Sequence, residues 1–232
     1  MEICAYFRLL KFISLFMIVK DDVLNLNYDL TEHLSYKTMP QYNYWRGWWN
    51  EEPRNKVEEV IQLLWQDYIN PTEYPNGGFE YWSRVISSGG FLEYHQDTGE
   101  YYYFDDNYWI SDKSLLYYPK VSEDCQGGFL EIAPYKRRGS LEDSQKAARC
   151  IDNNEIERIK AVENRMVLID AAQLHRVSTI YQGTRYNLAT SLWKITPDFF
   201  KEHENWNCGH IADPNKPQLN LQKVDWEYKN YK

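Results

Sequence analysis

Short apolar or alternating runs dominate the sequence from residue 82 to residue 193, and Gly, Asn and Asp separate them. Because successive side chains of a strand point to opposite faces, runs of this length and period predict β-strands rather than helices. Eight such strands at this spacing indicate an antiparallel sandwich or jelly roll. The eight runs span residues 82–86, 90–95, 114–118, 128–132, 156–162, 165–170, 175–180 and 185–193.

Two helical stretches flank the predicted strands. The first opens at Pro53 and carries apolar residues at helical spacing, with glutamates and glutamines on the opposite face. We expect this helix to cover one side of a sheet. A second, shorter helix is predicted over residues 141–150, inside a charged insertion at residues 135–154. The apolar residues of the first helix are Val57, Val60, Ile61, Leu64 and Trp65.

The length of 232 residues fits one domain with appended segments rather than two full domains. We expect an N-terminal segment with the supporting helix over residues 1–75 and a β core over residues 76–197. A C-terminal extension over residues 198–232 is expected to pack on that core. The predicted class is therefore a mainly β protein with flanking α-helices.

Charge and composition narrow the partners of the protein. There are 26 Lys and Arg residues against 34 Asp and Glu residues, a formal charge of −8, and no basic stripe. Phosphate backbones are bound by clustered cations, so nucleic acid is not an expected partner. Aromatic residues make up 16% of the chain, which favours a ligand cleft with aromatic walls. Sugars, peptides and small metabolites remain open as ligands.

Cysteine usage and the N-terminus bear on localisation. Four separated cysteines, without a Cys-x-x-Cys motif, predict reduced thiols in a cytoplasm-like compartment. Arg8 and Lys11 interrupt the apolar first 19 residues below transmembrane length, so no membrane partner is expected. A signal peptide would lack a small-residue cleavage site, and Met17 is an alternative start to Met1. The cysteines are Cys4, Cys125, Cys150 and Cys208.

A candidate metal site follows from the spacing of two ligands at the end of one predicted strand. His95 and Asp97 are two residues apart, so their side chains can lie on one face and reach one ion. His175 opens a later strand and is a good candidate for the third ligand. Two His and one carboxylate are the arrangement of non-haem Fe(II) oxygenases. An ordinary surface pair of His95 and Asp97, or a zinc site, are the alternatives.

A second candidate site lies ten residues after His175. A predicted hairpin returns through Arg185, on the same inward face as Asn187. A buried arginine needs an anion, and a bidentate carboxylate is its best geometric partner. The alternative interpretation is a surface arginine on an edge strand.

Six segments follow one another along the chain: GGFLEYHQD at 89–97, LLYY at 115–118, GGFLEIAP at 127–134, NRMVLID at 164–170, HRV at 175–177 and GTRYNLATSLW at 183–193. In this order they resemble the 2-oxoglutarate- and Fe(II)-dependent dioxygenase superfamily, and within it the prolyl 4-hydroxylase type. The resemblance covers roughly residues 80 to 195, and the spacing from His175 to Arg185 is its most specific part. It implies a double-stranded β-helix, the jelly-roll core shared with cupins, with the site in its open mouth.

By this resemblance, His95, Asp97 and His175 would bind Fe(II), and Arg185 would bind the distal carboxylate of 2-oxoglutarate. Tyr118 would donate its hydroxyl to the same carboxylate. Asn187 stands where many relatives carry serine, so any second hydrogen bond there would come from an amide. The resemblance implies O2 as co-substrate, allows ascorbate as an accessory reductant, and yields succinate and CO2. The expected reaction is hydroxylation of a C–H bond in a peptidyl-prolyl or small-molecule substrate.

Several alternatives stay open at this stage. Tyr118 is as readily explained by core packing as by ligand contact. Residues 100–110, rich in Tyr, are a candidate lid or substrate-binding loop. The rival to an enzyme is a non-catalytic jelly-roll module that binds a carbohydrate or metabolite, with His and Asp structural. His33, His203 and His210 receive no role, because none has a partner at ligand spacing.

Overall fold

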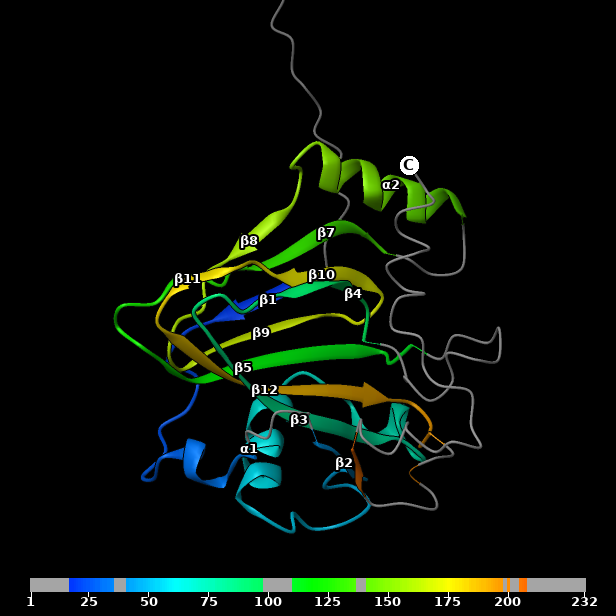
Figure 1. Ribbon diagram of the computed structural model, residues 1–232. Helices are drawn as coiled ribbons and strands as arrows, with labels where there is room; N and C mark the ends of the chain where they lie inside the picture. Colours follow the sequence, from blue (N-terminus) through cyan, green and yellow to red (C-terminus); the bar gives the residue numbers. More distant parts are fainter. Residues whose placement is uncertain are drawn as a thin grey trace, which may run out of the picture.

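The computed structural model describes residues 17–35, 41–97, 110–136, 141–197, 200 and 205–207, and its centre is a pair of facing antiparallel sheets (Figure 1). The large sheet has the order β1-β9-β5-β12-β3-β2-β13 and the small sheet the order β4-β10-β7-β8. The strands of the large sheet are β1 (Met17–Lys20), β9 (Arg165–Asp170), β5 (Lys113–Val121), β12 (Thr184–Trp193), β3 (Gly78–Ser87), β2 (Gln41–Trp45) and β13 (Asn205–Asn207). Those of the small sheet are β4 (Leu92–His95), β10 (Gln173–Val177), β7 (Leu130–Lys136) and β8 (Glu157–Ile159).

The chain passes back and forth between the two sheets. From β3 in the large sheet it enters β4 in the small sheet, returns to β5, and continues through β7 and β8 to β9. It then crosses to β10 and returns to β12, which lies between β3 and β5. A further ribbon, β6 (Gln126–Gly127) paired with β11 (Ile180–Gln182), closes one end. This path is a double-stranded β-helix, so the predicted mainly β jelly-roll fold is confirmed.

Apolar side chains fill the space between the sheets, which we call the barrel interior. Leu116 and Val167 of the large sheet pack against Leu130 and Ile132 of the small sheet. At the end closed by β6 and β11, Ile86 of β3 packs with Val177 of β10 and Leu92 of β4. These contacts identify the inward residues of each strand, because side chains two positions apart share a face.

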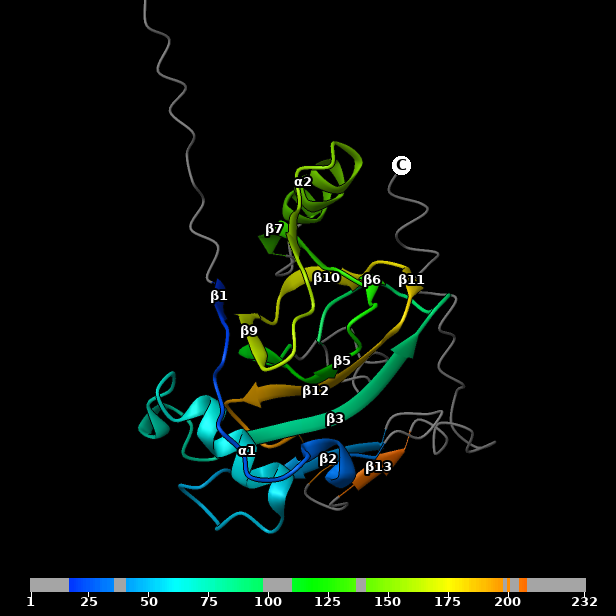
Figure 2. The same cartoon turned by 90° about the vertical axis from the view of Figure 1, so that its left-hand side faces the viewer.

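The outer face of each sheet is covered by one helix, as Figures 1 and 2 show. Helix α1 (Lys56–Trp65) packs on the large sheet, and Trp65 Nε1 donates a 2.8 Å hydrogen bond to Thr190 Oγ1. Helix α2 (Leu141–Asp152) lies over β7 of the small sheet. The five apolar residues predicted for the first helix are all buried. The predicted start at Pro53 is wrong, because Asn55 caps the helix by accepting from the backbone N–H groups of Val57 and Glu58.

Strand boundaries differ from the sequence prediction where glycine changes the backbone. The predicted strand 128–132 begins only at Leu130, as the start of β7, because Gly127, which ends β6, and Gly128 have φ values of +79° and +63°. The run 175–180 is likewise shared between β10 and β11. Strands also form outside the eight predicted runs, among them β1, which pairs with β9, and β2, which pairs with β3. Two one-turn 3-10 helices complete the elements, η1 (Leu30–His33) and η2 (Pro71–Glu73).

Several predictions fall wholly or partly outside the described residues. These include most of the aromatic stretch at 100–110, most of the C-terminal extension, Cys4, Cys208, His203 and His210. Cys125 and Cys150 are free thiols. Within the part of the chain that the structure describes, no helix is long and apolar enough to cross a membrane. The division of the chain at residues 75 and 197 stays a prediction.

Candidate functional site

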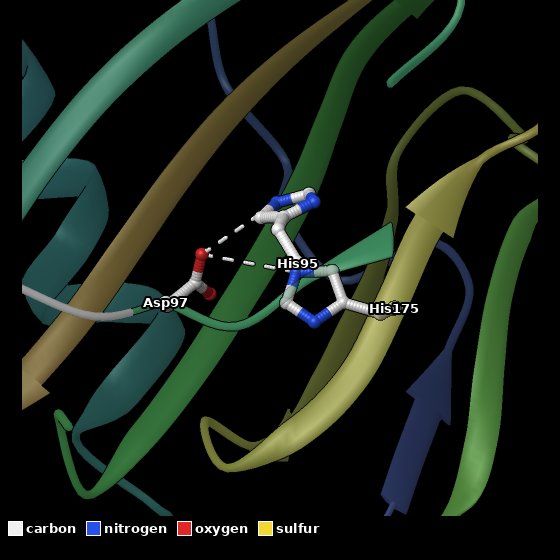
Figure 3. A group of neighbouring side chains, drawn as sticks. All are labelled: His95, Asp97 and His175. Carbon is white, nitrogen blue, oxygen red and sulfur yellow. Dashed lines mark ion pairs between the residues drawn. The ribbon is translucent and has the colours of Figure 1, made fainter. Parts of the chain in front are cut away.

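His95, Asp97 and His175 converge in the barrel interior (Figure 3). His95 ends β4 and lies directly opposite His175 of β10 in the strand register, and Asp97 follows two residues after His95. Asp97 Oδ1 is 3.7 Å from His175 Nε2 and 4.0 Å from His95 Nε2. The three ligand atoms lie within 4.8 Å of one another, so the group could hold one metal ion.

Backbone carbonyls orient both imidazole rings. Nδ1 of His95 lies 2.7 Å from the carbonyl of Glu93, and Nδ1 of His175 lies 2.9 Å from the carbonyl of Gln173. A carbonyl oxygen only accepts, so in the neutral form of each ring Nδ1 carries the proton and Nε2 keeps a free lone pair. In both histidines the Nε2 atom lies near the Asp97 carboxylate, and the other ring nitrogen is hydrogen-bonded to a backbone carbonyl. Metal-binding histidines are commonly oriented by such a hydrogen bond.

The surroundings of His95 favour the neutral ring that metal binding needs. The side chains of Asp97 and His175 are 8% and 4% exposed, and that of His95 is 37% exposed. An ordinary surface pair of His95 and Asp97 does not account for a buried carboxylate with a second, buried histidine beside it. Burial, followed by the neighbouring ring of His175, lowers the pKa of His95 well below its ordinary value. The carboxylate of Asp97 acts in the opposite direction, and the charge of Arg84 adds to the lowering. At neutral pH the His95 ring is therefore uncharged, the form that binds a metal.

Arg185 lies at the start of β12, with its side chain in the barrel interior. It is 0% exposed, and β12 has a neighbour on each side, so the alternative of a surface arginine on an edge strand is wrong. Its Nη1 donates a 2.8 Å hydrogen bond to the carbonyl of Gly128. Its Nε and Nη2 are buried and have no hydrogen-bond partner among the described residues. The guanidinium carbon lies 5.2 Å from the centre of the Tyr118 ring.

The residues around Arg185 fit a carboxylate. Tyr118 is fully buried, and its ring packs with the interior residues Leu130 and Ile132. Its hydroxyl has no hydrogen-bond partner within the described ranges. A buried guanidinium without an anion is costly, whereas a carboxylate would neutralise it and accept from both free guanidinium nitrogens and from the hydroxyl. Tyr118 thus combines the two roles that the sequence left as alternatives, core packing and an available donor.

Three further polar atoms in the interior lack a partner among the described residues, and two belong to residues that the sequence analysis did not select. The atoms are Oδ1 of Asn187, Nε2 of Gln173 and Nε of Arg84. Gln173 precedes His175 by two positions, and Arg84 lies directly opposite Asn187 on β3. Strand alternation predicts their inward direction. Whether they have partners depends on contacts that only the folded chain defines.

The protein therefore belongs by fold to the double-stranded β-helix class, with a two-histidine, one-aspartate group inside the barrel. No protein-family model matches the chain, and no curated protein matches it.

Solved structures do resemble it. A Pseudomonas putida prolyl-4-hydroxylase matches with 16% identity and a TM-score of 0.41, over 62% of this chain and 70% of that chain. The viral collagen prolyl hydroxylase vCPH from Paramecium Bursaria Chlorella virus-1, in a 2OG complex, matches with 13% identity and a TM-score of 0.47, over 77% and 96%. HygX from Streptomyces hygroscopicus, with iron bound, matches with 13% identity and a TM-score of 0.48, over 79% and 83%.

Proposed function

We propose that this protein is an Fe(II)- and 2-oxoglutarate-dependent dioxygenase that hydroxylates a C–H bond of a peptidyl-prolyl or small-molecule substrate, with succinate and CO2 as co-products. The observation that carries the proposal is a metal-binding group and an unneutralised buried arginine in one barrel interior. Both features have a place in this reaction, because the co-substrate brings a metal-chelating end and a carboxylate at its other end. Zinc would suit the three ligands but leaves the buried guanidinium unexplained.

Each residue has a binding or orienting role in the proposal. His95, Asp97 and His175 would hold the metal, as the two histidines and one carboxylate typical of non-haem Fe(II) oxygenases. Arg185 and Tyr118 bind the distal carboxylate of 2-oxoglutarate. Asn187 is two positions after Arg185 on β12 and shares its face, so its amide nitrogen is the proposed additional donor. The apolar residues around them exclude water. When bound, Fe(II) with O2 and 2-oxoglutarate supplies the oxidising chemistry of the reaction.

The experiment that tests this function is an anaerobic titration of the protein with Fe(II) and 2-oxoglutarate. We expect a weak visible charge-transfer band, and succinate release when air is admitted. The band should be absent in His175→Ala, because that variant lacks a buried ligand. His33→Ala is the matched control, since His33 is exposed in η1, outside the barrel interior. A wild-type protein that shows no band and releases no succinate would leave the non-catalytic binding module as the better interpretation.

A further inference from the structure

A second arginine, Arg84, points into the barrel interior. Ile86 of β3 is inward, because it packs with Val177 and Leu92 of the small sheet. Arg84 is two positions earlier on the same strand and so shares that face. In the register of β3 with β12, Ile86 pairs with Arg185 and Arg84 pairs with Asn187. Arg84 and Arg185 therefore belong to successive inward-facing residue pairs of β3 and β12, which we call neighbouring rows of the sheet.

Arg84 is on the side of the barrel where the metal-binding group lies. The chain turns from β3 into β4 after Ser87, and Ile86 and Leu92 pack together near that turn. Arg84 is one row from Ile86 on β3, and His95 is one row from Leu92 in the register with β10, where His175 pairs with His95 and Val177 with Leu92. Arg84 and His95 therefore occupy corresponding rows of the two facing sheets. In the neighbouring pair of strands, Asn187 of β12 and His175 of β10 occupy the corresponding rows.

Among the described residues, no ion pair joins Arg84 to a carboxylate. Its Nε is buried and has no hydrogen-bond partner in the described part of the chain. The proposed co-substrate has two carboxylates, of which one is taken by Arg185 and the other by the metal. Arg84 is only half-buried, unlike Arg185, so a molecule that enters later from solvent can still reach it. The unpartnered Oδ1 of Asn187, directly opposite, offers an acceptor beside this cation.

Resting on the proposed dioxygenase function, we propose that Arg84 binds a carboxylate of the prime substrate and thereby sets which C–H bond lies next to the metal. A planar guanidinium pairs with a carboxylate through two parallel hydrogen bonds, which fixes orientation as well as position. Asn187 Oδ1 accepts from an ammonium or N–H group next to that carboxylate. The substrate class that fits both residues is a free amino or imino acid, and a peptide fits through its C-terminal carboxylate or an acidic side chain.

The test compares acids with their neutral amides under anaerobic conditions, with Fe(II) and 2-oxoglutarate bound. The probes are the free protein amino acids including L-proline, their primary amides, and short peptides with a free C-terminus, an amidated C-terminus or an acidic side chain. Binding is read from the change in the charge-transfer band and from the thermal unfolding midpoint. We expect at least one carboxylate probe to bind, and its amide to bind at least tenfold more weakly. The free-acid and peptide arms identify the source of the carboxylate.

Variants then assign the effect to Arg84. Arg84→Gln should weaken binding of the carboxylate probe about 10- to 150-fold, the range for one hydrogen-bonded charge, without changing its affinity for the amide. Arg84→Lys should retain part of the affinity, because the charge remains. The dissociation constant of 2-oxoglutarate should be unchanged in both variants. Arg158→Gln is the matched control, since Arg158 lies on β8 and pairs with Glu131 outside the interior.

Three results would overturn the inference: equal binding of acids and amides, no binding of any carboxylate probe, or weakened 2-oxoglutarate binding in Arg84→Gln. The last would assign Arg84 to the co-substrate. The comparison of acid with amide uses the wild-type protein, so it stands even if a variant folds poorly. A missing charge-transfer band in the wild-type protein is a separate failure, because it removes the dioxygenase function itself.

Discussion

Replacing Arg185 by methionine is the sharpest test of the co-substrate site. The methionine side chain fills similar space but carries no charge. In the ligand-free protein Arg185 is completely buried, and two of its nitrogens lack partners among the described residues. Removing a buried charge without an anion should leave the free protein at least as stable as the wild type. If Arg185 instead stabilised the ligand-free fold, the variant would be less stable than the wild type.

With 2-oxoglutarate bound, the wild type should be more stable than Arg185→Met. Two hydrogen bonds to a charged group contribute about 3 kcal/mol of binding free energy at the low end of their range, so the variant should bind 2-oxoglutarate about 150-fold more weakly. At a ligand concentration of 100 times the wild-type Kd, linkage stabilises the wild type by about 2.7 kcal/mol and the variant by about 0.3 kcal/mol. For a protein of this size those values correspond to midpoint shifts of roughly 5–11 °C and about 1 °C.

Differential scanning fluorimetry with Zn²⁺ in place of Fe(II) measures the unfolding midpoint of the free protein and its shift with 2-oxoglutarate, without turnover. Arg158→Met is the control, because its side chain is 48% exposed and pairs with Glu131 on the outer face of the small sheet. It should keep the full 2-oxoglutarate shift. The reasoning is refuted if Arg185→Met lowers the midpoint of the free protein by several degrees while the ligand-dependent shift stays at the wild-type value.

Two further predictions concern the support of the site and of the fold. Gly128→Ala should weaken 2-oxoglutarate binding several-fold in a titration, because φ is +63°, an added Cβ would lie 2.8 Å from Ile180, and the Gly128 carbonyl holds Arg185. Gly89→Ala, with φ of +85° and open space around the Cβ, should carry backbone strain alone and leave binding intact. Glu58→Ala should cost about 3 kcal/mol in urea unfolding, since this fully buried carboxylate accepts from Arg54 and Tyr81. Glu59→Ala, which breaks only an exposed pair with Lys56, should cost under about 1 kcal/mol, and equal losses would contradict the assignment.

Much of the core was predictable because strand alternation is a local property. The eight runs correspond to core strands, and the two-residue spacing of His95 and Asp97 placed both side chains on one face. The edges of the fold were not predictable in this way. β1 and β2 form because β9 and β3 offer them backbone hydrogen-bonding partners, and neither strand lies in any of the eight predicted runs.

The sequence by itself determined which residues can act: two histidines, an aspartate, an inward arginine, and the period that turns them toward one side of their strands. Only the tertiary structure decided which of them meet and which are left without partners. The pairing of β10 with β4 brings His175 opposite His95, and the position of β12 between β3 and β5 buries Arg185. Unmet hydrogen-bonding capacity, at Arg185, Tyr118 and Arg84, depends on every neighbouring strand at once, and for that physical reason it is visible only in the folded chain.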